Sequence, residues 1–233
     1  MEFTLLGAAA TAVAGFWLML RWEAKRGNAA GCSLELWDAG LTAGATGLFI
    51  GRLVSMISVG ISPIANPSQI ILVRSGVSTT GAAIGAAAMF AYLARKSIVE
   101  TADAIGPSVL AGLAGWHAGC LATESCLGAV SDLPWAQAVA GGTVTRHPVE
   151  LYAAVLFGTA SIGLALWKQH SRPPRGAVTG LTIASLGGIR LATETMRISL
   201  SGGPVWLYAG ALLLGVGIVT ASIVQSRSIT SHT

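Results

Sequence analysis

The 233-residue chain is 53% hydrophobic and only 10% charged. Soluble domains carry about 25% charged residues, so this composition excludes an ordinary water-facing domain and indicates a polytopic membrane protein. The net charge of +4 does not indicate nucleic-acid binding, because the 14 basic residues are scattered between apolar runs. The 30 glycines suit helices that pack closely within a membrane.

The sequence predicts a single all-α membrane domain over residues 1–233. Apolar runs of about 20 residues predict transmembrane helices. Seven such runs lie near 2–21, 36–60, 78–94, 104–128, 148–168, 177–197 and 203–224. The first run continues directly into the charged stretch 21–26 without a small-residue cleavage site, so we expect a retained span rather than a signal peptide.

The distribution of Lys and Arg predicts the orientation of these spans. Most basic residues fall in the connections after the first, third and fifth runs, and after the last run. They are Arg21, Lys25, Arg26, Arg95, Lys96, Lys168, Arg172, Arg175 and Arg227. This end of the bundle is therefore predicted to be cytoplasmic, which leaves the N-terminus outside and the C-terminus in the cytoplasm.

A charged cluster near the end of the sixth run departs from this bias. Arg190, Glu194 and Arg197 follow one another at i, i+4 and i+7, so a helix carries all three on one face. A helix that enters the membrane near Ala177 places them about 20 to 30 Å from its start, in the outer leaflet. Because each charge at a bilayer centre costs roughly 2.5–3.5 kcal/mol, the cluster indicates a functional site.

Further polar residues are expected at the same depth. Arg52 lies about 24 Å along the second helix, and Arg146 and His147 open the fifth helix at its outer end. One interpretation is a structural ion pair that locks helices together, with Arg197 extending to the interface. The other is a cationic pocket for an anionic lipid headgroup, whose phosphate arginine binds through paired hydrogen bonds. Because several helices contribute, we favour the pocket.

Five motifs, taken in order, resemble those of the bacterial prolipoprotein diacylglyceryl transferases. They are GRLVSM (51–56), NPSQIILVRSGVSTTGAAIG (66–85), ADAIGPSVLAGLAG (102–115), RHPVELYAA (146–154) and GIRLATETMR (188–197). Each motif is weak alone, but their order along the predicted helices makes the resemblance specific. The predicted spans and the outside N-terminus agree with that family.

The resemblance implies a reaction. A diacylglyceryl group would pass from phosphatidylglycerol to a lipobox cysteine of a prolipoprotein, forming a thioether and releasing glycerol phosphate. It implies a multi-pass protein of the bacterial cytoplasmic (inner) membrane with no cofactor and no metal. The expected partners are phosphatidylglycerol or another anionic phospholipid, and a prolipoprotein signal peptide. Other membrane subunits are possible partners, and nucleic acid is not.

The resemblance and the charge pattern together define a predicted site. The catalytic residues are Arg190, Glu194 and His147. The residues that bind substrate or phosphate are Arg52, Arg197, Arg146, Tyr152 and Glu124. A thiol nucleophile needs activation, and a phosphate leaving group needs fixed positive charge.

The sequence also departs from the family pattern. Trp116 and Gly119 stand where the family signature usually carries an arginine and an asparagine. Thr80 replaces the usual histidine, and Ala153 replaces a glutamate. These changes keep open an alternative function, a non-catalytic membrane subunit that retains the fold and a phospholipid pocket. A pore or transporter is disfavoured, because the inner halves of the predicted helices lack charges.

Two histidines are candidates for the base that replaces the missing one. His147 precedes Pro148 and marks a helix start, so a capping role and a catalytic role are equally favoured. For His117, helix packing through a hydrogen bond to a carbonyl or a neighbouring side chain is favoured over catalysis.

The odd number of cysteines excludes a fully paired internal disulfide framework. Cys120 and Cys126 would lie about 120° apart on an ideal helix, so an unbroken helix does not present both to one metal. We favour their packing as small residues over a disulfide, which requires an unwound segment. Cys32 is expected to be cytoplasmic and reduced.

Overall fold

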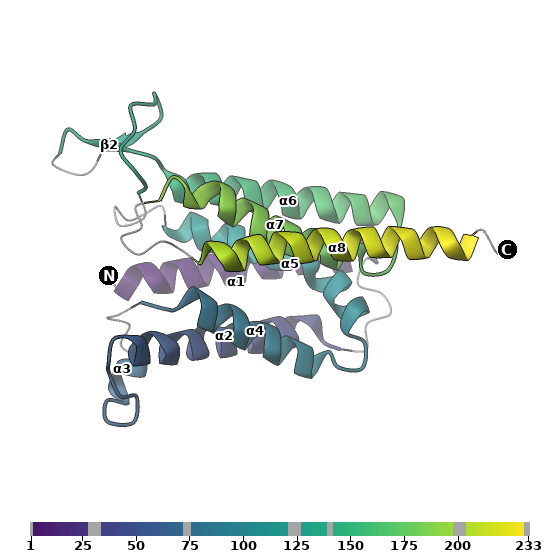
Figure 1. Cartoon of the computed structure of the whole chain (residues 1–233), viewed down its shortest axis with the longest axis horizontal. Helices are drawn as coiled ribbons and strands as arrows, with labels where there is room; N and C mark the ends of the chain where they lie inside the picture. The colour runs from purple at the N-terminus through teal and green to yellow at the C-terminus, as the bar shows by residue number, and fades with distance from the viewer. Residues whose placement is uncertain are drawn as a thin grey trace.

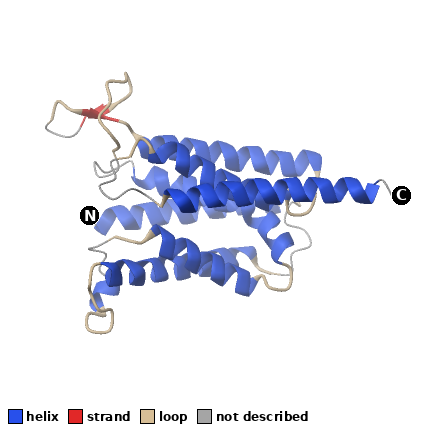
Figure 2. Ribbon diagram, viewed as in Figure 1, coloured by secondary structure: helices blue, strands red, loops and turns tan. Residues whose placement is uncertain are grey.

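The computed structural model describes residues 2–27, 34–71, 76–120, 127–138, 142–197 and 204–230. In these ranges the protein forms eight α-helices and one short β-hairpin (Figure 2). The helices are α1 (Glu2–Ala24), α2 (Leu36–Ser58), α3 (Ser68–Ile71), α4 (Thr79–Leu93), α5 (Ile98–Cys120), α6 (Val149–Ser171), α7 (Ala177–Glu194) and α8 (Val205–Thr230). The strands β1 (Gln137–Ala138) and β2 (Thr145–Arg146) pair antiparallel.

The long helices run roughly alongside one another (Figure 1). α1 packs along α5, α5 along α6, and α7 along α8, while α2 pairs with α4. The two chain termini lie at opposite ends of the bundle, and the hairpin projects from the end where α6 begins. The chain is therefore an all-helical bundle whose connections alternate between its two ends.

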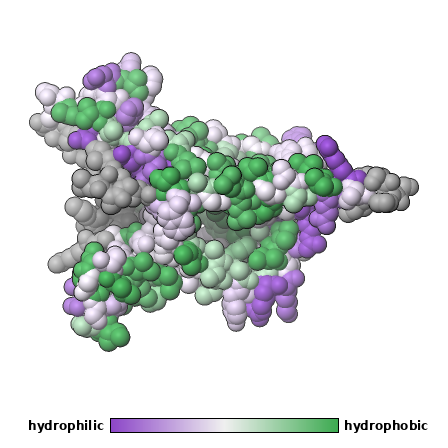
Figure 3. Space-filling model, in the orientation of Figure 1, coloured by the Kyte–Doolittle hydropathy of each residue, from purple (hydrophilic) through white to green (hydrophobic). Residues whose placement is uncertain are grey.

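The surface and length of the helices are those of a membrane protein. Three helical stretches in the described chain are long and apolar enough to cross a membrane, namely α2, α6 and Val205–Ser228 of α8, and α4 is a shorter apolar helix. A 23-residue helix such as α6 is about 34 Å long, against a hydrocarbon core of roughly 30 Å. Hydrophobic residues cover the middle of the visible face, and hydrophilic ones gather where α8 ends (Figure 3).

Each predicted apolar run coincides with a helix, and α5 differs most from its prediction. Expected over 104–128, α5 begins at Ile98 and ends at Cys120, and residues 127–128 are not helical. Hydropathy misses residues 98–103 because this stretch contains Glu100 and Asp103. α3 and the hairpin were not predicted, because both lie within polar connections that carry no apolar periodicity.

Asp103 of α5 caps the start of α7. Its carboxylate accepts hydrogen bonds from the backbone N–H groups of Gly176, at 2.6 Å, and Thr179, at 2.7 Å. These donors have no partner within their own helix, so a neighbouring carboxylate satisfies them. Gly176 has φ 88°, a left-handed conformation that glycine adopts without steric cost. The cap sets the position of α7 along α5.

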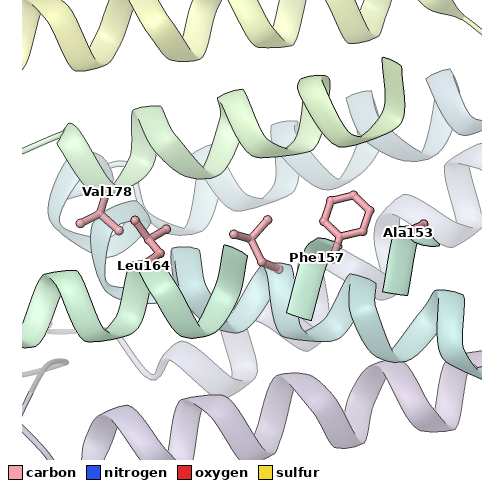
Figure 4. Packing of buried hydrophobic residues seen from close by; sticks show 5 residues of the cluster. Ala153, Phe157, Leu164 and Val178 are labelled. Atoms are coloured by element: carbon pink, nitrogen blue, oxygen red, sulfur yellow. The ribbon is translucent and has the colours of Figure 1, made fainter. Parts of the chain in front are cut away.

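The core between α5, α6 and α7 is apolar. Leu110, Ala153, Phe157, Leu164 and Val178 form a buried cluster there (Figure 4). The Phe157 ring also stacks on the imidazole of His117, with ring centroids 5.4 Å apart. The core therefore reaches the end of α5 that carries polar side chains.

Glycines allow α7 and α8 to approach closely. A Cβ atom on Gly187 would overlap the carbonyl oxygen of Tyr208, and one on Gly215 would overlap the backbone of Ala184. Small residues allow this kind of backbone approach in membrane helix pairs. Gly217, on the same helix as Gly215, has nothing within 4 Å of its Cβ position.

These two α8 glycines give a matched test of the helix contact. The substitution Gly215→Ala should destabilise the protein by about 1–3 kcal/mol, because the new methyl group overlaps α7 backbone. Gly217→Ala brings the same gain in helix propensity without the overlap. Thermal unfolding in detergent should therefore give a lower Tm for Gly215→Ala than for Gly217→Ala, and equal Tm values would contradict this packing.

Candidate functional site

Three helix termini meet at one end of the bundle. α5 and α7 finish there, and α6 starts there (Figure 1). Residues 128–129 tie two of these termini together. The N–H of Gly128 donates to the carbonyl of His147 at 2.7 Å, and the N–H of Ala129 donates to the carbonyl of Met196 at 2.8 Å. The polar side chains on these termini are thereby held close together.

A continuous charged network crosses these termini. Arg190 Nη2 donates to Glu194 Oε2 at 3.4 Å, and Arg197 Nε lies 3.9 Å from the same oxygen. Arg197 Nη2 in turn donates to Glu150 Oε1. The other oxygen of Glu150 is hydrogen-bonded to Nδ1 of His117. The signs alternate along the network, so each carboxylate lies between two groups that are basic.

The centre of this network is buried. Glu150 and His117 are each 6% exposed. A lone charge at such a position is strongly destabilising, so the two partners of Glu150 compensate for its loss of water. The side chain of Arg197 is 28% exposed and that of Arg190 is 17% exposed. The network therefore extends from a sealed interior to a partly open edge.

Arg190 keeps part of its guanidinium available. Its Nη2 donates to Glu194 and, at 3.0 Å, to the hydroxyl of Tyr208 on α8, whose ring lies 5.1 Å from the guanidinium carbon. Within the described chain its Nε and Nη1 donate no hydrogen bond. Each of these two nitrogens can still donate a hydrogen bond to an oxygen of an anion.

Arg197 also has a hydrogen-bond donor that the described residues leave unused. Its Nη2 is bound to Glu150, while its Nε is buried without a hydrogen bond in the described part of the chain. The structure thus brings together three predicted residues, Arg190, Glu194 and Arg197, as the sequence spacing predicted. Their arrangement can bind an anion between two cations that a carboxylate holds in place.

Arg52 makes a different set of contacts. It is buried, and its Nε and Nη2 donate to the carbonyl of Gln69, at 3.1 and 2.7 Å. Its Nη1 donates to the carbonyl of Gly76 at 2.8 Å. The guanidinium therefore attaches the connection between α3 and α4 to α2. This contact lies near the membrane depth at which the pocket is predicted.

The remaining predicted residues lie around the hairpin. Arg146, on β2, donates from Nη1 to the carbonyl of Gly128 at 3.2 Å. The hydroxyl of Tyr152 accepts a hydrogen bond from Trp135 Nε1 at 2.7 Å and lies 3.5 Å from His147 Nδ1. These contacts attach the hairpin to the first turn of α6, and His147 forms no ion pair with the described residues. The predicted helix start at Pro148 is one residue early, since Pro148 is the N-cap and α6 begins at Val149. Arg146 was expected to open this helix, but it lies in β2.

Three residues with sequence predictions lie outside the described ranges. Glu124, a predicted substrate ligand, lies there, and so do Cys32 and Cys126. Cys120 is described, and it is disulfide-bonded rather than a packing residue. The favoured interpretation of Cys120 was therefore wrong, because it assumed a helix that continues through residue 128, whereas α5 ends at Cys120. Among the described residues no group of three His, Cys, Asp or Glu side chains is placed to hold a metal ion.

Glu150 is the site residue that sequence reasoning missed. Two signals pointed to it: it is an acidic residue inside the RHPVELYAA motif, and it opens a long apolar run. Its pairing with His117, 33 positions away, and with Arg197, 47 positions away, has no local signature. The structure also shows that the neighbour of His117 is a buried carboxylate.

Comparisons with known proteins give a consistent result. The family model described as prolipoprotein diacylglyceryl transferase matches residues 3–229. The chain is 32% identical over 139 residues to the phosphatidylglycerol–prolipoprotein diacylglyceryl transferase of Pseudoalteromonas translucida, covering 58% of this chain and 52% of the relative.

Two further relatives carry the same name. The protein from Methylococcus capsulatus is 36% identical over 129 residues, which cover 54% of this chain and 49% of the relative. The protein from Shewanella oneidensis is 28% identical over 210 residues, which cover 87% of this chain and 77% of the relative. The matched region is thus about half the length of the first two relatives.

The contacts of Arg52 predict a role in holding the 61–78 connection. The substitution Arg52→Lys should loosen it, because a compact ammonium group cannot reach both carbonyls, which the planar guanidinium contacts through different nitrogens. Leaving a buried polar group unsatisfied costs about 1–3 kcal/mol, so cleavage within residues 61–78 in limited proteolysis should be roughly tenfold faster. Arg95→Lys, at an exposed arginine, is the control. Unchanged proteolysis together with weaker anion binding would instead assign Arg52 to the pocket.

Proposed function

Because the chain belongs to the prolipoprotein diacylglyceryl transferase family, we propose that it transfers the diacylglyceryl group of phosphatidylglycerol to the cysteine thiol of a prolipoprotein. The sulfur forms a bond to the glycerol carbon, and the bond from that carbon to the phosphate oxygen breaks. The products are a thioether and glycerol phosphate.

The arrangement of Arg190, Glu194 and Arg197 carries this proposal. A phosphate leaving group gains negative charge as its C–O bond breaks, and fixed cations stabilise that charge in a site of low dielectric constant. The guanidinium of Arg190, with Nε and Nη1 unbonded in the described chain, and the guanidinium of Arg197 supply the cations. Glu194 lies between them and holds both in place.

The other predicted residues take supporting roles in the proposal. Arg146, His147 and Tyr152 lie at the base of the hairpin, where a peptide acceptor arriving from outside the bundle would meet α6. Arg52 orders the connection before α4. Glu124 remains a proposed substrate ligand from its place in the family signature.

We also propose the membrane topology. α1, α2, α4, α5, α6, α7 and α8 make seven spans of the bacterial inner membrane, with the charged network at the outer side. The basic residues before α2, after α4 and after α6 support this orientation, since Lys and Arg are enriched on the cytoplasmic side. The opposite placement of the two termini in Figure 1 agrees with an odd number of spans.

The departures at Thr80, Trp116 and Ala153 support the second candidate, a non-catalytic membrane subunit that keeps the phospholipid pocket. In that case the network would bind a phospholipid headgroup without cleaving it. The two functions differ in one observable, the formation of a thioether.

Formation of the thioether tests the transferase proposal directly. Purified protein in phosphatidylglycerol nanodiscs should convert a lipobox peptide to its diacylglyceryl thioether, with release of glycerol phosphate, both measured by mass spectrometry. Arg190→Gln and Glu194→Gln should each lower the rate by about 10²-fold or more, as loss of one charge-stabilising group does in other enzymes.

Arg95→Gln removes an exposed arginine next to Tyr92 and should leave the rate unchanged. If folded wild-type protein binds phosphatidylglycerol but forms no product, the transferase proposal fails. Stable co-purification with other membrane proteins would then support the subunit.

Protease accessibility tests the proposed topology. A peptide tag placed after residue 233 should be digested by protease in inverted membrane vesicles and protected in right-side-out vesicles, because seven spans place the C-terminus in the cytoplasm. A tag before residue 1 should show the opposite pattern. Two tags with the same accessibility would require an even number of spans.

A further inference from the structure

The pair formed by His117 and Glu150 is the part of the charged network to which the proposed function gives no role. Cations can bind a phosphate without a buried carboxylate and a histidine behind them. Burying this pair is costly unless both groups are well compensated. A thiol acceptor, however, needs a group that takes its proton, because the thiolate is the nucleophile.

The hydrogen bond to Glu150 sets the protonation pattern of the ring. Nδ1 of His117 faces the carboxylate, so the neutral ring carries its hydrogen on Nδ1 and a lone pair on Nε2. Within the described chain Nε2 makes no hydrogen bond, and it is not among the fully buried atoms without a partner. No described residue therefore engages this lone pair.

The orientation of the ring is fixed on two sides. Phe157 stacks on it at an interplanar angle of 10°, and Glu150 holds its edge. Arg197 binds the second oxygen of Glu150, so the carboxylate itself has little freedom to rotate. His117 lies three residues before the end of α5, which is about 4.5 Å along the helix axis. The base is thus held near the surface at which the acceptor would arrive.

His117 has these features and the other described histidines do not. His147 has the phenol of Tyr152 near its Nδ1, at 3.5 Å, instead of a carboxylate. His170 lies exposed near the end of α6, with Nδ1 2.8 Å from the carbonyl of Leu166. The combination of a carboxylate partner, a stacked ring and a free Nε2 occurs at His117.

We propose that His117 is the catalytic base for the acceptor thiol, and that Glu150 and Arg197 position it; this proposal rests on the transferase function proposed above. Nε2 of His117 takes the thiol proton, and the sulfur electron pair forms the bond to the glycerol carbon of phosphatidylglycerol. The C–O bond to the phosphate breaks, and its electron pair leaves with glycerol phosphate. The imidazolium then releases its proton to water.

The charge of the network changes in step with the reaction. With neutral His117 the two arginines balance the two glutamates, and protonation of the ring makes the network cationic. This positive charge appears while the leaving group becomes more negative. Glu150 stabilises the imidazolium directly, as a buried carboxylate does for the histidine of a catalytic triad.

The test compares two acceptors. A lipobox peptide with cysteine requires a base, whereas the same peptide with selenocysteine has a more acidic nucleophile that ionises without one. His117→Gln should lower kcat for the cysteine peptide by about 10²-fold or more, with KM for phosphatidylglycerol within about twofold of wild type. For the selenocysteine peptide, the loss of kcat in His117→Gln should be less than about tenfold. A purely structural defect would lower both rates equally.

Two further variants make the outcome decisive. Glu150→Gln should lower kcat for the cysteine peptide by about tenfold, and should lower it less for the selenocysteine peptide. This variant provides the test if His117→Gln does not fold. His170→Gln is the matched control and should equal wild type with both acceptors.

Equal deficits for the two acceptors, or wild-type kcat in folded His117→Gln, would refute His117 as the base while leaving the transferase function intact. Wild-type protein that forms no product with either acceptor would refute the transfer reaction, and the assignment of the base with it.

Discussion

The burial of the Glu150 carboxylate is the constraint on which the outer end of the structure depends. Removing one partner of a buried ion pair typically costs about 3–5 kcal/mol, so Arg197 and His117 must both reach this carboxylate in the folded state. The ends of α5 and α7 are thereby held to the start of α6. Asp103 imposes a similar requirement at the other end, where it caps α7 from α5. Two carboxylates at opposite ends thus determine how α7 lies along α5, and the apolar cluster around Phe157 fills the space between them.

A third carboxylate extends this logic to α1. Glu23 is fully buried and accepts a hydrogen bond from Lys168 of α6 at 3.2 Å, and the same ammonium donates to the carbonyl of Ala104 in α5 at 3.1 Å. In a bilayer, helices gain little from hydrophobic association, because lipid is as apolar as their side chains. Polar contacts and close backbone packing must therefore specify the arrangement. The glycines between α7 and α8 supply the packing, and the three carboxylates supply the polar contacts.

The sequence predicted the parts of the site that have a local pattern. The spacing of Arg190, Glu194 and Arg197 predicts one helix face, and the structure places the three side chains in contact. The partner of Arg197 was not predictable, because Glu150 lies on another helix and any of several carboxylates had suitable chemistry. Hydropathy located the helices but misplaced α5, since Glu100 and Asp103 reduce the apolar signal of a turn that is nevertheless helical. The error over Cys120 followed from that misplacement, because the assumed helix kept the cysteines apart.

The substitutions relative to the family do not by themselves argue against catalysis. The reaction requires a proton acceptor close to the thiol and cations close to the phosphate. Neither group has to be supplied by a particular helix. Thr80 removes a histidine from α4, yet His117 on α5 presents a free Nε2 with a carboxylate behind it. Trp116 removes an arginine from α5, yet Arg190 retains an unbonded Nε and Nη1, and Arg197 a buried, unbonded Nε, within the described chain. Glu150 supports the proposed base and is itself positioned by Arg197 of the phosphate site. Proton transfer and phosphate binding are therefore coupled. A subunit without chemistry would need the cations for a headgroup and could use the buried histidine–carboxylate pair to join α5, α6 and the end of α7. Joining the helices does not require an unbonded Nε2 on His117, and this atom is therefore the feature of the pair that favours the proposed catalysis.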